Sequence, residues 1–488
     1  MSDSFSSTRQ ESTILESATG RLSMLGGSRS ALQRPLSTAG SGLGSSLLYG
    51  ASAEEKVVLD IGSFTLRAGF SGDSAPLHTG ELFGDFKAVG PSSRRKGQIR
   101  GLFGLSEAPD EEMLDALLLE QLREVYRCQL LLDPKSRKVA IAEGALLPIQ
   151  IKRALARVLL GNLRVPQLSF YPSSVAGLMT CGATSGLVID CGHRSTTVIP
   201  VYDCRPLTAY MTYTTMGGNA LFENLCGLLK KFARFQPFDK SLSEQLVDSQ
   251  MLDEQLCYHL LNNLLYASPV PLPAAKLAEA SKGLSVGEAS QDIVEWFESS
   301  VTASSPVTRL TIETPQYGHG TLLIPSWVRE RAVEVLLTGD VSQEHLGLVD
   351  TVAQCIQRAP VDTRRELVKQ ILMVGGVADM PNIRMRMLQD LIAYLQRDSR
   401  WAALANDVAL AEERVTKDSG NKSAMAPGED QSNQHGSQSS PANGSVFRPS
   451  ERPWIGVSLA VAAKIGGLDL RRDGFDGYNV PDWTSIIS

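Results

Sequence analysis

The amino-acid sequence predicts an α/β fold in which two similar lobes face one another across a cleft. Three observations predict it: a short hairpin at residues 57–70, a second hairpin of the same kind at 186–202, and a strand running into a Gly-Gly turn and a helix at 370–382. A hairpin pattern that occurs twice, each time followed by strand and helix patterns, indicates two lobes built on one plan.

The first hairpin joins two strands through an Asp-x-Gly-Ser turn. The apolar run before Asp60 suits a buried strand, and Gly62 permits the tight turn. The turn amides and the Ser63 hydroxyl can face an anion. Asp60 can hold a hydrated Mg²⁺ through water, and Arg67 on the returning strand can reach a phosphate oxygen. The alternative is an ordinary hairpin whose aspartate bonds its own turn amides.

The second hairpin repeats the pattern, with an apolar strand that ends in Asp190-Cys191-Gly192. If the two turns face one another, phosphates would lie between them, in the cleft where ligands normally bind. Further along the chain, Gly375 and Gly376 lack side chains and therefore permit close approach by a flat base or a sugar. The alternative for this pair is a plain strand-to-helix turn.

Composition limits the possible classes of protein. The 488 residues are 43% hydrophobic and 20% charged, enough for a large core in two or more domains or one two-lobed body. The net charge of −6 argues against a protein that binds nucleic acid through phosphate neutralisation. Seven scattered cysteines without a C-x-x-C pair fit reduced thiols in the cytosol. No apolar run approaches the ~20 residues of a membrane span, so we expect no membrane insertion.

Two segments are predicted to be disordered from their composition. Residues 1–53 are rich in Ser, Gly and Thr, and residues 412–450 are rich in Ser, Gln, Asn, Gly and Pro; neither shows a hydrophobic period.

Taken in chain order, the motifs resemble the actin family. The matching segments are 59–63 with 67–72, 188–192 with 199–202, 217–218, 361–364, 375–376 with Pro381, and 454–458. Within that family the chain is similar to the divergent actin-related subunits at the pointed end of dynactin, on the segments 132–141, 190–194, 359–365 and 480–483.

This resemblance implies an actin-like fold with ATP or ADP and Mg²⁺ between the lobes. The first lobe would be 54–181 with the returning 451–488, and the second lobe would be 182–411. Phosphate contacts would carry over to Gly62, Ser63, Arg67, Asp190, Gly192 and His193, and Gly375 and Gly376 would meet the adenosine and ribose. Asp60 and Asp190 would order the water shell of the metal.

Three departures from the actin pattern predict weak or absent ATP hydrolysis. Phe64 stands where actins have a glycine, Ser173 where they have the glutamine that positions the attacking water, and His193 where they have an aspartate. Phosphoryl transfer depends on such positioning, so the nucleotide would be a structural ligand rather than a substrate. If the second turn faces phosphate, His193 and Arg194 would supply positive charge where actins supply negative.

The resemblance also implies a role in a filament. Residues 73–109 show few of the strands needed for the small subdomain through which one actin subunit inserts into the next, so we expect a reduced second subdomain. A subunit that lacks this insertion would cap the pointed end of a head-to-tail filament. The implied partners are actin-related filament subunits and other pointed-end subunits of dynactin, with dynein and cargo as indirect partners in the cytoplasm.

Two other functions remain open. One is an active ATPase or kinase of the same superfamily. The other is a nuclear actin-related subunit of a chromatin-remodelling complex, against which the short basic run Arg94-Arg95-Lys96 argues only mildly.

Overall fold

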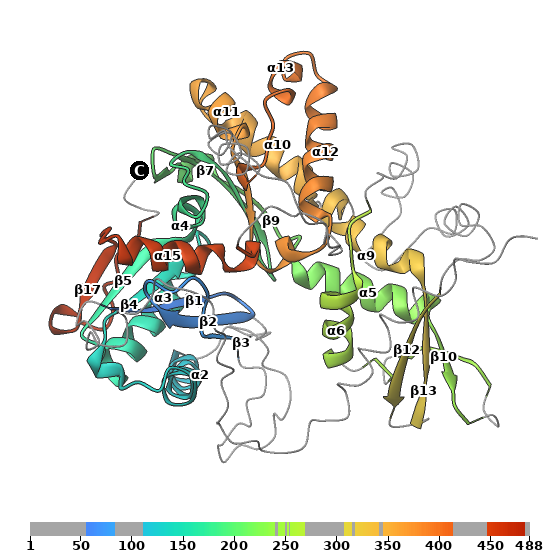
Figure 1. The fold of residues 1–488 in the computed structure, drawn as a ribbon, viewed down its shortest axis with the longest axis horizontal. Coiled ribbons are helices and arrows are strands. Elements are labelled where there is room, and N and C mark those ends of the chain that lie inside the picture. Colours follow the sequence, from blue (N-terminus) through green and yellow to red (C-terminus); the bar gives the residue numbers. More distant parts are fainter. Residues whose placement is uncertain are drawn as a thin grey trace, which may run out of the picture.

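The computed structural model describes residues 55–82, 111–239, 243–248, 251–252, 254–268, 307–314, 318–340, 345–412 and 447–483. Within these ranges the chain forms two α/β lobes on either side of helix α4 (Ser173–Met179), which confirms the predicted fold class (Figure 1). The arm 1–53, most of the 412–450 insertion and most of the 73–109 segment lie outside the described residues. The predictions made for them therefore stay predictions.

The first lobe is built on a six-stranded sheet in the order β17-β5-β4-β1-β2-β3. β1 pairs antiparallel with β2 and parallel with β4, so the predicted hairpin forms. The strands are β1 (Val57–Ile61), β2 (Thr65–Phe70), β3 (His78–Glu81), β4 (Val139–Glu143), β5 (Gln167–Pro172) and β17 (Leu468–Arg471).

Both faces of this sheet are covered, as continuous apolar strands require. Alternate residues of β1 divide between two cores: Val57 and Leu59 pack with α2 (Glu111–Glu124) and α3 (Ile149–Ala156), whereas Val58 packs with α4 and α15 (Arg452–Ala462). Both α2 and α3 continue into a wider π-helical turn, Val125–Gln129 and Arg157–Asn162.

The second lobe repeats the same pairing. β6 pairs antiparallel with β7 and parallel with β16, as β1 does with β2 and β4. The sheet contains β6 (Gly186–Cys191), β7 (Thr196–Tyr202), β8 (Arg205–Pro206), β9 (Thr212–Thr214) and β16 (Ile371–Val374). One face packs on helices of its own lobe, and the other packs on Leu178 of α4, which therefore lies between the two sheets.

The rest of the second lobe contains most of the helices. These are α5 (Gly218–Phe232), α6 (Glu254–Leu264), α9 (Ser326–Thr338), α10 (Leu348–Arg358), α11 (Val361–Val368), α12 (Ile383–Gln396) and α13 (Ala402–Ala405). A four-stranded sheet has the order β11 (Gln245–Leu246), β10 (Arg234–Pro237), β13 (Gly318–Pro325), β12 (Val307–Thr314), and β14 (Gly339–Asp340) pairs with β15 (His345–Leu346). Short 3₁₀ turns lie at Pro134–Ser136, Thr208–Tyr210, Gly376–Asp379, Pro449–Glu451 and Arg472–Gly474. In these ranges we find no helix with the length and apolar character needed to cross a bilayer.

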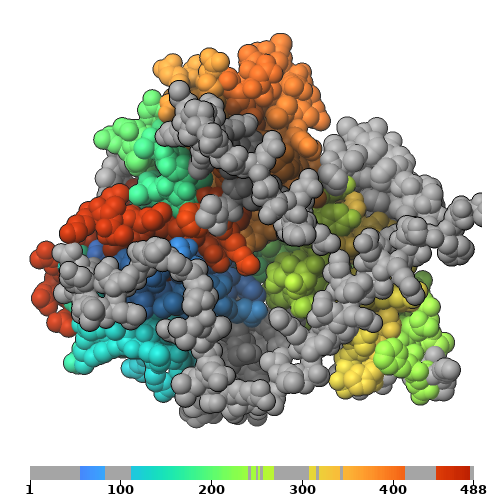
Figure 2. Space-filling model, viewed as in Figure 1, coloured from blue at the N-terminus to red at the C-terminus, as the bar shows by residue number. Residues whose placement is uncertain are grey.

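Helix α15 crosses α4 at very short range and joins the end of the chain to its beginning. A Cβ added to Gly456 would lie 1.8 Å from the backbone oxygen of Ala176, so only glycine permits this approach. Trp454 is fully buried, and its Nε1 donates to the carbonyl oxygen of Val58 at 2.9 Å. Figure 2 shows α15 in red lying against the blue strands of the first hairpin.

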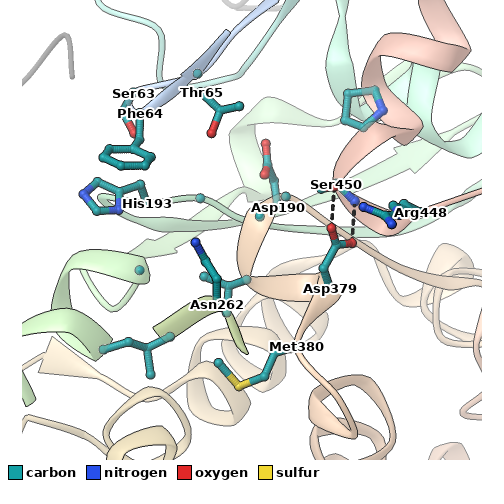
Figure 3. A pocket seen from close by; sticks show the side chains of 18 of the residues that line it. Ser63, Phe64, Thr65, Asp190, His193, Asn262, Asp379, Met380, Arg448 and Ser450 are labelled. Atoms are coloured by element: carbon teal, nitrogen blue, oxygen red, sulfur yellow. Dashed lines mark hydrogen bonds between the residues drawn. The ribbon is translucent and has the colours of Figure 1, made fainter. Parts of the chain in front are cut away.

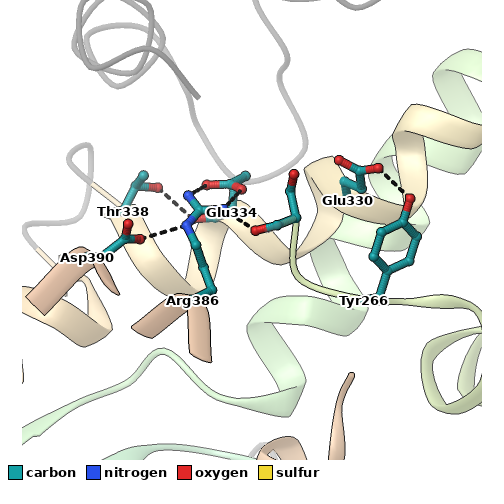
Figure 4. Close-up of polar contacts among 7 residues, drawn as sticks. Tyr266, Glu330, Glu334, Thr338, Arg386 and Asp390 are labelled. Carbon is teal, nitrogen blue, oxygen red and sulfur yellow. Dashed lines mark hydrogen bonds and ion pairs between the residues drawn. The ribbon is translucent and has the colours of Figure 1, made fainter. Parts of the chain in front are cut away.

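A buried polar network fastens α12 to α9 in the second lobe (Figure 4). Arg386 donates to both carboxylate oxygens of Glu334 at 3.1 Å and to Asp390 at 2.8 Å, and the Arg386 and Glu334 side chains are almost fully buried. Arg386 also donates to the carbonyl oxygen of Ser268 at 2.9 Å. Because the charges are buried together and hydrogen-bonded, they are compensated within the fold.

Candidate functional site: a cleft between the two hairpin turns

The two hairpin turns open into one cavity of about 520 Å³ between the lobes. Its volume is typical of small-molecule sites. It is lined by every residue that the sequence predicted to contact a nucleotide or metal: Asp60, Gly62, Ser63, Arg67, Asp190, Gly192, His193, Gly375 and Gly376. The structure therefore brings together residues that lie more than 300 positions apart in the chain.

The floor of the cavity carries two carboxylates and one cation. Arg67 donates to the Asp60 carboxylate at 3.0 Å, and these residues face one another in the register of the first hairpin. Arg67 was expected to reach a phosphate oxygen, but here its contact is with Asp60. Burial and the charge of Asp60 raise the pKa of Asp190 to about 6, and burial also raises the pKa of Asp60.

This charge balance fits a hydrated divalent cation. Two acidic groups share a single arginine, and a cation placed between Asp60 and Asp190 would relieve their repulsion. Among the described residues no cluster of three or more His, Cys, Asp or Glu side chains has the arrangement of a metal site. A Mg²⁺ ion at this floor would therefore take most of its oxygens from water and from a phosphorylated ligand, which is its usual preference.

The turn glycines use their own amides to close the hairpins. The Gly62 amide donates to the carbonyl oxygen of Thr65 at 2.9 Å, and the Gly192 amide donates to that of Ser195 at 3.0 Å. These two N–H groups are thus engaged within the protein, so an anion between the turns would depend on other donors, such as the Ser63 hydroxyl.

Aromatic rings meet where the two turns approach. The Phe64 ring stacks on the His193 ring with centroids 4.6 Å apart (Figure 3). It also stacks on the Tyr258 ring of α6 at 4.8 Å. Burial and the neighbouring Arg194 lower the pKa of His193 to about 4. With this pKa the His193 ring is neutral at pH 7 when no anion lies beside it, and the expectation that it supplies positive charge to a phosphate stays a prediction.

The Gly-Gly turn lines the cavity directly beside the second hairpin, and the expectation that it contacts a nucleoside stays a prediction. Gly375 has a φ of +91°, and a Cβ there would lie 2.4 Å from the Cys191 carbonyl oxygen, so the turn requires glycine. Asn262 of α6 and Met380 line this region (Figure 3). An apolar side chain beside an amide suits a flat base that both stacks and forms hydrogen bonds.

The end of the insertion also reaches this site. The Ser450 amide and hydroxyl donate to the two carboxylate oxygens of Asp379 at 3.0 and 2.6 Å. Residues 447–450 were assigned to the insertion on composition, but they are described here, and Ser450 is buried beside the cavity. The contact with Asp379 thus holds the backbone at Ser450, within the segment assigned to the insertion.

Sequence reasoning placed Ser173 correctly at the cavity wall but missed Tyr258, Asn262 and Ser450. The apolar spacing of residues 256–265 is a helical signal that could have located the first two. Nothing local marks Ser450, since its partner Asp379 lies 71 residues earlier in the chain.

Comparisons with known proteins agree with this architecture. Residues 110–255 match the actin family model. This range runs from α2 of the first lobe through the second hairpin to the start of α6. The chain is 24% identical to a centractin of Saccharomyces cerevisiae over 72% of its own length and 86% of the relative. It is 22% identical to actin-related protein 4 of Arabidopsis thaliana, over 74% of this chain and 90% of the relative. The family match shows an actin-family domain over residues 110–255, and the two-lobed topology with its paired hairpin turns is consistent with the actin-like fold.

Proposed function

We propose that this protein is a non-catalytic actin-related subunit that caps the pointed end of the actin-related filament of dynactin and anchors other pointed-end subunits there. In that position it would support dynein-driven transport along microtubules. The observation that carries the proposal is the stacking of the Phe64 and His193 rings between the two hairpin turns. Actins have a glycine in place of Phe64 and an aspartate in place of His193. A terminal subunit does not need the hydrolysis that those residues serve.

The chemistry of the cleft favours weak or absent ATP hydrolysis. Ser173 is buried at the cavity wall and is too short to hold a water in the way the actin glutamine does. His193 stands where actins have an aspartate, and its imidazole offers no carboxylate to order a metal-bound water. Because phosphoryl transfer relies on positioning and metal charge, loss of both groups is expected to reduce the rate by several powers of ten.

A bound nucleotide would then stabilise the fold rather than be consumed. ATP or ADP with Mg²⁺ would lie between the acidic floor and the wall lined by Asn262 and Met380, held on both lobes. A ligand that binds only the folded state raises stability in proportion to the logarithm of its concentration over its dissociation constant. We expect the nucleotide to contribute in this way.

The capping role takes further support from chain length and from the relatives. Only residues 83–110, which lie outside the described part of the chain, separate β3 with its following turn from α2. In the actin pattern this interval holds the subdomain that inserts into the next subunit. Similarity to a centractin places the chain among actin-related proteins, and a subunit able to contact a filament at one end only would stop its growth.

Affinity purification of the tagged full chain from cells tests the assembly role. The proposal expects actin-related filament subunits and other pointed-end subunits to co-purify, with one copy of this chain for each filament. Several copies spread along each filament would contradict capping.

Phosphate release from the purified chain tests the catalytic part separately. We expect the wild type to match buffer and the triple variant Phe64→Gly, Ser173→Gln, His193→Asp to gain measurable release, because it restores the actin residues. Release by the wild type well above buffer would instead favour the ATPase or kinase alternative.

A nuclear role is the second candidate, and the similarity to actin-related protein 4 of Arabidopsis thaliana and Oryza sativa favours it. Cell fractionation distinguishes the two roles. A cytoplasmic, cytoskeletal chain that co-purifies with dynein-associated proteins supports the cap. A nuclear chain that co-purifies with nucleosome-remodelling ATPases supports the alternative.

A further inference from the structure

One side chain of the first lobe crosses the cleft to pack on rings of the second. Phe64 lies in the turn between β1 and β2, His193 in the turn between β6 and β7, and Tyr258 on α6. Phe64 stacks on both partners at an interplanar angle of 28°, with centroids 4.6 Å and 4.8 Å away. Stacked rings at these separations attract one another beyond the effect of area burial alone.

Each turn is held in place by contacts with its own lobe, in addition to the ring stacking. The Phe64 carbonyl oxygen accepts the Leu82 amide at 2.8 Å, which ties the first turn to the end of β3. The His193 carbonyl oxygen accepts the Asn219 amide at 2.6 Å, and a Cβ on Gly218 would lie 3.0 Å from the His193 ring, so α5 packs directly against the second turn. Because the turns are already held, stacking of the rings loses little conformational entropy from loop ordering.

The floor of the cleft works against closure. Asp60 and Asp190 carry like charges from opposite lobes, and Arg67 compensates only part of them. In a cleft closed by a nucleotide, the ligand's phosphates and metal join the lobes. In this protein the stacked rings of Phe64, His193 and Tyr258 also join the two lobes, without a ligand.

We propose that Phe64, His193 and Tyr258 form a ring clasp that holds the cleft closed whether or not a nucleotide is bound. The inference goes beyond the capping role and does not depend on it. A subunit with such a clasp presents the same surface in its nucleotide-bound and nucleotide-free states.

Hydrogen exchange of the full-length chain tests the clasp, with the amides of residues 61–65 and 191–195 as the readout. Each sample is measured after treatment with EDTA and again after addition of ATP with Mg²⁺. In the wild type we expect the two states to exchange within about twofold of each other. In Phe64→Gly we expect exchange of the EDTA-treated sample to rise about tenfold, because two ring pairs are lost, and ATP with Mg²⁺ to reverse the rise.

Phe232→Ala is the matched control, because Phe232 packs on Trp327 within the second lobe at 4.8 Å and does not cross the cleft. It should leave exchange at both turns unchanged. If Phe64→Gly fails to fold, His193→Ala removes the other ring and should give a smaller rise of the same sign. The inference is overturned if wild-type exchange rises on EDTA treatment as much as in Phe64→Gly, if the clasp variants leave exchange unchanged, or if Phe232→Ala gives the same change. Failure of the co-purification experiment would leave this result unaffected.

Discussion

The most direct test of the cleft's electrostatics is the pH dependence of stability that His193 introduces. The pKa of His193 is lowered from 6.5 to about 4, mainly by burial and further by Arg194. A base whose folded pKa is depressed contributes stability above its unfolded pKa and loses it as the pH falls. The loss therefore occurs between pH 6.5 and 4, and a shift of this size corresponds to at most about 3 kcal/mol.

The perturbation is His193→Phe, which keeps a ring against Phe64 but cannot be protonated. Urea unfolding at several pH values between 7.5 and 4 gives the free energy of unfolding for each protein. We expect the wild type to lose up to about 3 kcal/mol more than the variant over this interval. The exposed His319→Phe should follow the wild type. Parallel curves for wild type and His193→Phe would refute the reasoning, since they would mean that His193 titrates equally in both states.

Three further predictions follow from packing and buried charge. Gly456→Ala should destabilise the protein by several kcal/mol, seen as a lower midpoint in thermal unfolding, because its Cβ would meet the Ala176 oxygen at 1.8 Å. Arg386→Met should cost about 3–5 kcal/mol in urea unfolding, because Glu334 is left buried without its partner; a loss below about 1 kcal/mol would contradict this. Asp190→Asn should raise the free energy of unfolding at pH 7.5 without Mg²⁺ but not at pH 4. The pKa of Asp190 is raised to about 6 in the folded protein, so ionisation of this buried group destabilises the wild type as the pH rises towards 6. Equal gains at both pH values in chemical denaturation would contradict this.

The fold was predictable because its signals are local and repeated. The Asp-x-Gly turns, the apolar strands before them and the Gly-Gly turn at 375–376 each depend on a few neighbouring residues, and together they located the cavity. The pairing of Asp60 with Arg67 was also within reach, because a hairpin of this length places the two residues opposite one another. The phosphate contact predicted for Arg67 stays a prediction.

Contacts between distant elements were not predictable in the same way. Phe64 was identified from the sequence as standing where actins have a glycine. Its stacking on Tyr258, however, depends on where α6 lies, and no pattern near Phe64 indicates that position.

Glu412, the last described residue before the 413–446 interval, is held by two ion pairs, and this has a practical consequence for labelling the protein in cells. Arg384 and Arg452 both contact the Glu412 carboxylate, the latter at 3.1 Å, so the chain leaves the second lobe for residues 413–446 beside the helix to which it returns. A fluorescent protein spliced into that interval would start and finish at neighbouring points and would not pull the lobes apart. A fusion placed directly after Trp483, whose side chain is buried, would strain the first lobe instead.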